Sequence, residues 1–417
     1  MSIGVELAVG YIETFAGNGK ARSTGDGKLA AKAGIPLPHH VALDKDGRFL
    51  YIAESGSDRV RRVDLTTGTL HNFAGIGETC YSGDSGVCAE AGLYLPLGLA
   101  FDSENHLYIC DSGSNRIRRV DRDTGIITTV VGTGEFGFNG DGPALEVNLT
   151  YPAAIAFDKN DILYIADTQA HRVRRYEPRT GHVTTIAGTW TAEDDAREQP
   201  LVARNLVVLS GDAIGIDFSD DHGWLRPECS DGLDLGLYLD DGRPALEARL
   251  YDVVGIAVDR QGDVYLVDKG SNRVRKIDRN TGIISTVAGV CRYGFDGDGK
   301  PAVKSMLHAP EAVVFDADNH MYISDTMNHR VRKVDHTTGI ITTVAGNGDS
   351  GYEDKHMGGC GAARFVQKEG TGMVKHGDGL LATEAVVNSP VGLALDAHGC
   401  LYMCERAENK IRRTRLW

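Results

Sequence analysis

Residues 96–132 read PLGLAFDSENHLYICDSGSNRIRRVDRDTGIITTVVG, and this stretch decides the fold. It opens with an almost wholly apolar run that ends at Asp102, and a second apolar run extends from Leu107 to Asp111. A third run alternates apolar and charged residues, and a fourth, rich in β-branched residues, follows the turn Asp123-Thr124-Gly125. These runs predict four successive β-strands, the first of them buried on both faces.

The same order of runs occurs six times along the chain. The acid that ends the first run of each copy recurs at Asp44, Asp102, Asp158, Asp259, Asp316 and Asp396. A four-stranded unit repeated roughly every 40–60 residues is typical of a β-propeller. We therefore predict an all-β protein in which residues 1–417 form a single six-bladed β-propeller.

The sixth copy ends at Trp417, after its third strand, and has no outer strand. The missing strand is found at the other end of the chain, because residues 11–17 match the outer strand of the fifth copy at residues 340–346. The N-terminal strand is thus predicted to complete the last blade. Closing the ring in this way removes the free sheet edges.

Two motifs give the chain a close resemblance to the NHL-repeat family. They are DTMNHRVRKVD at residues 325–335 and the loop FDGDGKPA at residues 295–302. The chain looks like a stand-alone NHL propeller of bacterial or fungal type, and the resemblance implies six blades. It does not imply a function, because related propellers include scaffolds, RNA binders and enzymes.

Charge and hydropathy limit the partners. The net charge is −14, and an acidic surface repels phosphate backbones, so we expect no nucleic-acid partner. No apolar run approaches the ~18–20 residues that span a bilayer, and the N-terminus lacks the pattern of a signal peptide. We expect a cytoplasmic monomer with no membrane partner, in which Cys80 and Cys88 are free thiols rather than a disulfide.

Two insertions depart from the repeat, at residues 189–239 and 347–376. Residues 213–218 faintly resemble an innermost strand, but no Arg-Val-Arg strand follows, so a seventh blade is not expected. Each insertion joins an outer strand to the next inner strand. Because such connections lie on one face of a propeller, the insertions are predicted to cover the ligand-binding face, with His222 and Trp224 contacting the substrate.

Most residues that recur in every blade are interpreted as structural. The acids that end the second strands are Glu54, Asp111, Asp167, Asp268, Asp325 and Glu405. The Gly-Asp-Gly-type loops contribute Asp26, Asp84, Asp141, Asp241, Asp298 and Asp378. We expect these carboxylates to bind loop amides and the following arginine. His171 and His329, which occupy an Asn/His position of the repeat, are expected to be structural as well.

The candidate site lies where the repeat is broken. The residue after the Pro that opens each inner strand should face the mouth of the central channel, and it reads His39, Leu97, Ala153, Val254, Glu311 and Val391. His40 follows His39, and His308 precedes Pro310 by two positions. We predict His39, His40, Glu311 and His308 as catalytic residues. The predicted substrate-binding residues are Tyr94, Tyr251, Asn388, His222 and Trp224.

A His/Glu group contributed by different blades could transfer protons or bind a metal. The sequence favours an enzyme of the lyase, cyclase or hydrolase type that acts on a small organic substrate; the alternative is a non-catalytic protein-binding scaffold. The related peptidyl-hydroxyglycine amidating lyase binds zinc through His at this position in three blades, whereas here only Pro38-His39-His40-Val41 matches. No cofactor is therefore assigned, and a divalent metal stays an open alternative.

Overall fold

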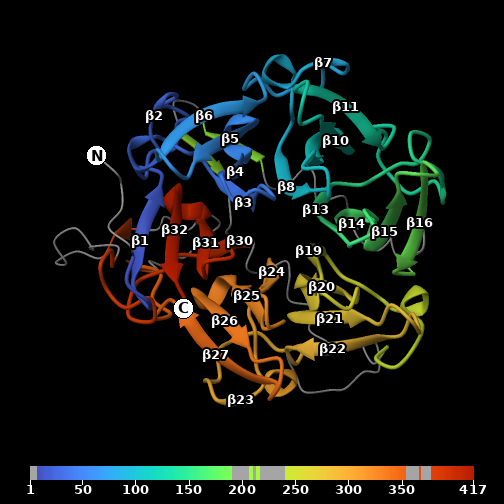
Figure 1. The fold of residues 1–417 in the computed structure, drawn as a ribbon. Helices are drawn as coiled ribbons and strands as arrows, with labels where there is room; N and C mark the ends of the chain where they lie inside the picture. The colour runs from blue at the N-terminus through green and yellow to red at the C-terminus, as the bar shows by residue number, and fades with distance from the viewer. Residues whose placement is uncertain (1–6, 190–205, 210–212, 217–239, 354–365, 368–376) are drawn as a thin grey trace.

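The computed structural model describes residues 7–189, 206–209, 213–216, 240–353, 366–367 and 377–417. Six antiparallel sheets of four or five strands stand around a central axis as the blades of a β-propeller (Figure 1). Within these residues every helical turn is a short 3-10 helix, so the all-β, six-bladed prediction is confirmed. None of these turns is long or apolar enough to cross a membrane.

In five blades the four main strands follow chain order from the axis outward, and in the sixth the outermost strand comes from the N-terminus. The innermost strands are β3 (Pro38–Leu43), β8 (Pro96–Phe101), β13 (Pro152–Phe157), β19 (Val253–Val258), β24 (Val313–Phe315) and β30 (Pro390–Leu395). The second strands are β4 (Phe49–Glu54), β9 (Leu107–Asp111), β14 (Leu163–Asp167), β20 (Val264–Asp268), β25 (Met321–Asp325) and β31 (Cys400–Glu405). The third strands are β5 (Arg59–Asp64), β10 (Arg116–Val120), β15 (Arg172–Glu177), β21 (Arg273–Ile277), β26 (Arg330–Val334) and β32 (Lys410–Arg415). The outer strands are β6 (Thr69–Ala74), β11 (Ile126–Val131), β16 (His182–Ala187), β22 (Ile284–Ala288), β27 (Ile340–Ala345) and β1 (Ile12–Ala16).

Short elements complete the blades. Four outer edges carry a two-residue strand: β2 (Lys28–Leu29), β7 (Gly86–Val87), β12 (Gly142–Pro143) and β23 (Lys300–Pro301). Near these edges lie η1 (Ala30–Lys32), η3 (Cys88–Glu90), η7 (Ala245–Glu247) and η9 (Ala302–Lys304). Between second and third strands lie η2 (Ser55–Ser57), η4 (Ser112–Ser114), η5 (Thr168–Ala170), η8 (Lys269–Ser271), η10 (Thr326–Asn328) and η11 (Arg406–Glu408).

The N-terminal strand closes the ring, as predicted. β1 pairs antiparallel with β32 as the outermost strand of the last blade (Figure 1). Ile12 and Ala16 are fully buried there, and Glu13 forms an ion pair with Arg413. The last blade is therefore built from both ends of the described chain.

A buried arginine in each third strand joins the parts of its blade. The six side chains, at most 2% exposed, are Arg61, Arg118, Arg174, Arg275, Arg332 and Arg412. Each lies 2.6–3.6 Å from the acid of its Gly-Asp-Gly-type loop. In five blades it also lies 3.2–3.5 Å from the acid that ends the second strand. The structural interpretation of both sets of carboxylates is thus confirmed.

Hydrogen bonds of one repeated kind join neighbouring blades. The residue before each inner strand has a positive φ and donates its N–H to a side chain in the preceding blade, at 2.7–3.1 Å. The six donor–acceptor pairs are Leu37–Asn409, Leu95–Asp58, Tyr151–Asn115, Asp252–His171, Ala309–Asn272 and Ser389–His329. His171 and His329 accept through Nδ1, so both histidines hold blades together, as expected.

Glycine lets neighbouring inner strands approach closely in three blades. A Cβ at Gly392 would lie 2.4 Å from the carbonyl oxygen of His39 and 2.6 Å from Cα of His40. The equivalent Gly98 and Gly255 face the following blade in the same way. Only glycine fits at this distance, and the contact at Gly392 sets the position of the two histidines singled out above.

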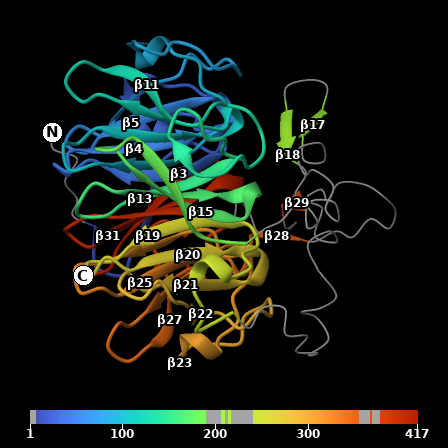
Figure 2. The ribbon, with the colours of Figure 1, turned by 90° about the vertical axis from the view of Figure 1, so that its right-hand side faces the viewer.

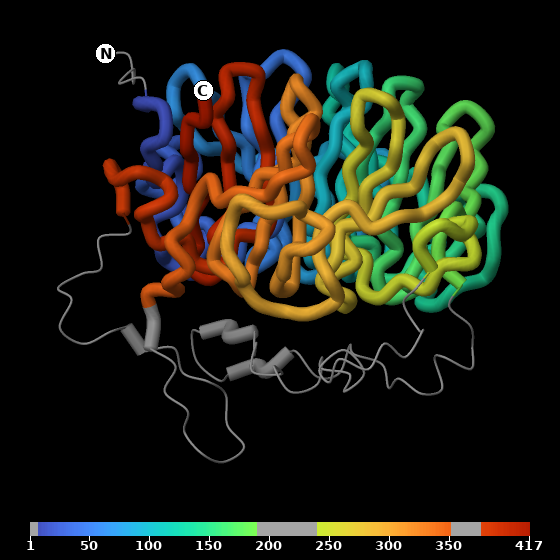
Figure 3. The backbone as a smooth tube through the Cα atoms, turned by 90° about the horizontal axis from the view of Figure 1, so that it is seen from below, coloured from blue at the N-terminus to red at the C-terminus, as the bar shows by residue number. Residues whose placement is uncertain are grey.

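Most of both insertions lies outside the described residues. In the described parts, β18 (Ala213–Ile216) pairs with β17 (Leu206–Leu209), and β28 (Tyr352–Glu353) pairs with β29 (Val366–Gln367). These are separate two-stranded sheets (Figure 2), so residues 213–216 do not begin a seventh blade. The six blades form a short cylinder when seen from below (Figure 3).

The cysteines of the described residues are free thiols. Cys80 and Cys88 form no disulfide, and the thiol of Cys88 donates to the carbonyl oxygen of Phe73 at 3.1 Å. Cys110 and Cys404 are fully buried in apolar clusters, where they act as small core residues.

We predict that deleting residues 1–17 strongly destabilises the protein. The deletion removes β1 and exposes the edge of β32 together with the buried contacts of Ile12 and Ala16. Thermal unfolding should shift down by roughly 10 °C or more, or the protein should aggregate. Deleting residues 1–8 leaves β1 intact and is the matched control. Equal melting of both truncations would contradict the closure.

We predict that Gly392→Ala destabilises the protein by about 1–3 kcal/mol, the usual scale of overpacking. The added methyl group meets the backbone of His39 and His40, which cannot yield as a flexible side chain can. Gly142→Ala is the control, because the nearest atom to its Cβ is 4.0 Å away. Denaturant unfolding measures both, and equal midpoints would show that the inner strands have room to separate.

Candidate functional site

The candidate site begins with His39 and Glu311, which occupy the same position in two blades. His39 is the second residue of β3, and Glu311 lies two residues before β24. In each blade a positive-φ residue, Leu37 or Ala309, turns the chain into the inner strand. The equivalent Leu97, Ala153 and Val391 are buried, whereas His39 and Glu311 keep part of their surface exposed. The backbone therefore presents an imidazole and a carboxylate where other blades present apolar groups.

A second break in the repeat supplies two cations that the sequence analysis missed. The residue after the second-strand acid is Ser55, Ser112, Thr168 and Thr326 in four blades, but Lys269 and Arg406 in the other two. The hydroxyls of the four donate to a backbone carbonyl at the start of an inner strand, at 2.6–2.7 Å. Comparing this position across the six copies would have revealed the exception.

The two sets of exceptions meet across blade boundaries. Lys269 of the fourth blade lies beside Glu311 of the fifth, with Nζ 2.7 Å from Oε1. Their side chains are 35% and 11% exposed, so the pair is partly withdrawn from water. Arg406 of the sixth blade acts electrostatically on His39 of the first. We call His39, Lys269, Glu311 and Arg406 the mouth cluster.

Electrostatics fix the charge states within the mouth cluster. Burial raises the pKa of Glu311, but nearby positive charge, first that of Lys269, outweighs it and lowers that pKa to about 2. Burial, and after it the charge of Arg406, lowers the pKa of His39 to about 3. Burial alone lowers the pKa of His40 to about 4. At neutral pH Glu311 is therefore a carboxylate, and both imidazoles are neutral.

The two imidazoles retain unused hydrogen-bonding capacity. Nδ1 of His39 and Nδ1 of His40 are inaccessible to solvent and have no hydrogen-bond partner among the described residues. A buried polar atom without a partner is uncommon in folded proteins. Tyr151 adds a phenol nearby, and burial raises its pKa with smaller effects from Arg406 and Tyr94. Tyr94, a predicted substrate-binding residue, thus lies near the mouth cluster.

Three other predicted residues make contacts that stabilise the blades. The ring of Tyr251 stacks on His171 with centroids 5.3 Å apart, and that of His308 lies 5.1 Å from Tyr293. Asn388 is 5% exposed, and its amide donates to Glu408 at 3.1 Å. Their predicted functional roles stay predictions.

His222 and Trp224 lie outside the described residues, so their predicted contacts with a substrate stay untested. Within the described ranges, no three His, Cys, Asp or Glu side chains are grouped so that they could hold a metal ion. The chemistry available to the described part of the site is therefore that of a carboxylate, two cations, neutral imidazoles and phenols.

The first insertion leaves the ring near this face. It leaves after β16, where Gly188 packs against the backbone of His171, and His171 accepts the hydrogen bond from Asp252 at the start of the next inner strand. The departure point thus lies at the end of the ring where the inner strands begin, which is also the end that carries the mouth cluster.

Comparison with known proteins agrees with the repeat. A family model described as the NHL repeat matches residues 93–120, and one described as the teneurin NHL domain matches residues 238–295. Protein SUPPRESSOR OF QUENCHING 1, chloroplastic, of Arabidopsis thaliana is 33% identical over 42% of this chain and 17% of its own length. NHL repeat-containing protein 2 of Homo sapiens is 30% identical over 43% of this chain and 26% of its own length.

Among solved structures, an auxiliary nutrient binding protein from Bacteroides ovatus has a similar fold. Its TM-score is 0.57 at 14% identity, over 97% of this chain and 76% of that one. Six closed blades and the matched repeats define the class, a β-propeller built from repeats. The repeats of this chain are similar to NHL repeats, and two of the curated relatives it matches, in Homo sapiens and Bos taurus, are NHL repeat-containing proteins. The chain spans well under two thirds of each of these curated relatives.

We predict that His39 contributes to the loss of stability in acid. Its pKa falls from an ordinary 6.5 to about 3 on folding, so the unfolded chain binds the proton more tightly. The contribution of the neutral His39 to the free energy of unfolding is complete above pH 6.5 and is lost as the pH falls towards 3. At pH 5 the loss is about 2 kcal/mol. His39→Gln should flatten this dependence in denaturant unfolding. The exposed His398→Gln is the control, and identical pH profiles for wild type and His39→Gln would contradict the assignment.

Proposed function

We propose that the protein binds a small polar organic molecule at the mouth of its central channel. The supporting observation is the paired departure from the repeat: an imidazole and a carboxylate replace apolar residues, and cations replace hydroxyls in the adjoining blades. Binding sites in ring-shaped folds commonly combine a rigid frame with a few convergent polar groups.

A purely structural ion pair explains only part of this arrangement. Lys269 and Glu311 neutralise one another, and a structural role would account for them. It does not account for His39, which is neutral, lies in the same cluster and has a buried Nδ1 without a partner among the described residues. A ligand hydroxyl or amide could hydrogen-bond to the part of this imidazole that stays exposed at the mouth.

A second candidate function is catalysis on the bound molecule, as a lyase, cyclase or hydrolase. His39 favours it, because a general base must be neutral before it accepts a proton. Its low pKa makes it a weak base in the empty site, and a negatively charged substrate group beside it would raise that pKa. Glu311 would remain ionised and orient or stabilise charge, since its pKa is about 2.

Ligand binding is tested by giving the site the residues of the other blades. Lys269→Thr with Glu311→Val copies Thr168 and Val391 at the equivalent positions and leaves no unpaired charge. The double variant should melt within a few degrees of wild type and lose stabilisation by small polar metabolites in a thermal-shift screen. A ligand that stabilises both proteins equally would contradict a site at the mouth. Capture of a protein partner, with no small-molecule binding, would instead support the scaffold alternative.

For the catalytic alternative, we predict that His39→Ala and Glu311→Gln each lower turnover of a substrate found by that screen by roughly a hundredfold, the scale for losing a general base or a charged anchor. Steady-state rates measure the effect, and Thr326→Ser is the control because it keeps the hydroxyl that donates to Pro390. Unchanged turnover in both variants would remove the mouth cluster from catalysis.

A further inference from the structure

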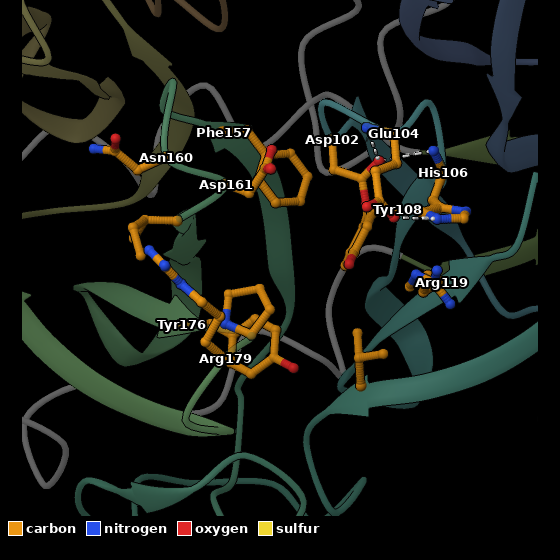
Figure 4. A pocket seen from close by; sticks show the side chains of 13 residues that line it. Asp102, Glu104, His106, Tyr108, Arg119, Phe157, Asn160, Asp161, Tyr176 and Arg179 are labelled. Carbon is orange, nitrogen blue, oxygen red and sulfur yellow. Dashed lines mark hydrogen bonds and ion pairs between the residues drawn. The ribbon is translucent and has the colours of Figure 1, made fainter.

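A second hollow lies at the opposite end of the ring, between the second and third blades. It has a volume of about 580 Å³ and is lined by residues that follow or end the inner strands β8 and β13, among them Asp102 and Phe157 (Figure 4). Inner strands begin at the channel mouth and end here, so the two places are separated by the length of a strand. We call this hollow the blade 2–3 groove.

Two side chains that line the groove are smaller than their counterparts in the first blade, although the fifth blade carries the same pair, His320 and Val344. In the first blade Phe49 and Phe73 pack around Tyr51, with the Phe73 ring 4.9 Å from that of Tyr51. In the second blade the equivalent positions hold His106 and Val130, which line the groove. A valine at this position leaves more room beside the tyrosine than a phenylalanine does, and Tyr176 distinguishes this groove from the fifth blade.

Three aromatic side chains line the groove, of which Phe157 is partly exposed and Tyr108 and Tyr176 show only an edge, at 4% and 8% exposure. Tyr108 and Phe157 meet edge to face with centroids 4.8 Å apart. Tyr176 faces them from the third blade (Figure 4). The other five blades carry Val63, Val120, Ile277, Val334 and Thr414 at the position of Tyr176. The large aromatic ring is therefore a feature of this groove and not of the repeat.

Hydrogen-bond donors and acceptors are both present at the rim. Arg119, Arg179 and Asn160 supply donors, and the side chains of Arg179 and Asn160 make no hydrogen bond or ion pair within the described part of the chain. Glu104 and Asp161 supply acceptors, the first beside His106 at 3.1 Å and the second accepting from Ser103. With Asp102, carboxylates outnumber guanidinium groups here, so the rim does not favour an anion.

We propose that the blade 2–3 groove binds a neutral sugar ring. A pyranose has apolar C–H faces that pack on Tyr and Phe rings, and its hydroxyls both donate and accept hydrogen bonds, as this mixed rim requires. The volume is within the ~300–1,000 Å³ range of small-molecule sites. The site does not depend on the mouth cluster.

The test uses saturation-transfer NMR and calorimetry on the full chain with glucose, galactose, mannose, xylose, N-acetylglucosamine and their common disaccharides. We expect at least one to bind with its ring protons saturated by the protein. Val130→Phe, which copies Phe73 of the first blade, should abolish binding, and Tyr176→Val, which copies Val120, should weaken it tenfold or more. Because Tyr176 is 8% exposed in the core, Tyr176→Val should lower the melting temperature, and binding is compared at a temperature at which both variants are folded.

The double variant Lys269→Thr/Glu311→Val is the matched control and should bind the sugar as wild type does, because it alters only the channel mouth. This separates failure of the groove from failure of the proposed function. Absence of binding by every sugar, or equal binding by wild type and by folded Tyr176→Val, would overturn the proposal. Binding of a planar aromatic probe such as indole in place of the sugars would also overturn it.

Discussion

The structure depends on one interaction: an arginine with almost no exposed surface held between two carboxylates. In the second blade Arg118 lies 2.6 Å from Asp84 and 3.3 Å from Asp111, and so fixes the outer loop to the end of the second strand. Burial raises the pKa of Asp111 to about 6, although the backbone N–H of Tyr94 and the charge of Arg118 oppose this. Removing either partner would leave a charge uncompensated in the blade, which explains why the group of three recurs.

The buried arginine and its acids show which polar residues the blade needs for its own structure and which it does not. Because the arginine and its two acids recur in every copy of the repeat and are in contact in five blades, the repeat itself explains the six carboxylates that end second strands. The informative position is the residue after each of these acids. In four blades it carries a hydroxyl that holds the start of an inner strand, and in the other two it is Lys269 or Arg406. The repeat does not require these two cations. They lie beside His39 and Glu311, which the repeat does not require either.

The fold followed from the sequence because strand-forming runs, turns and the missing sixth outer strand all agree. His39 and Glu311 were found by comparing one position across the copies. Lys269 and Arg406 stand far along the chain from the residues they adjoin, and only the closed ring brings Lys269 to Glu311 and Arg406 to His39. The charge states also required the structure, since the low pKa of Glu311 depends on Lys269 in another blade. The blade 2–3 groove could not be foreseen, because whether the side chains around Val130 and Tyr176 leave a space between them depends on how the two blades pack.

The six hydrogen bonds between blades all run in one sense around the ring, from the start of each inner strand to a side chain of the blade before it. The ring consequently has a direction, and the two flanks of a blade are not interchangeable. A duplicated blade brings with it both the donor for its predecessor and the acceptor for its successor. A ring of this kind can therefore gain a blade by duplication, or lose one by deletion, with every hydrogen-bonded junction already complementary.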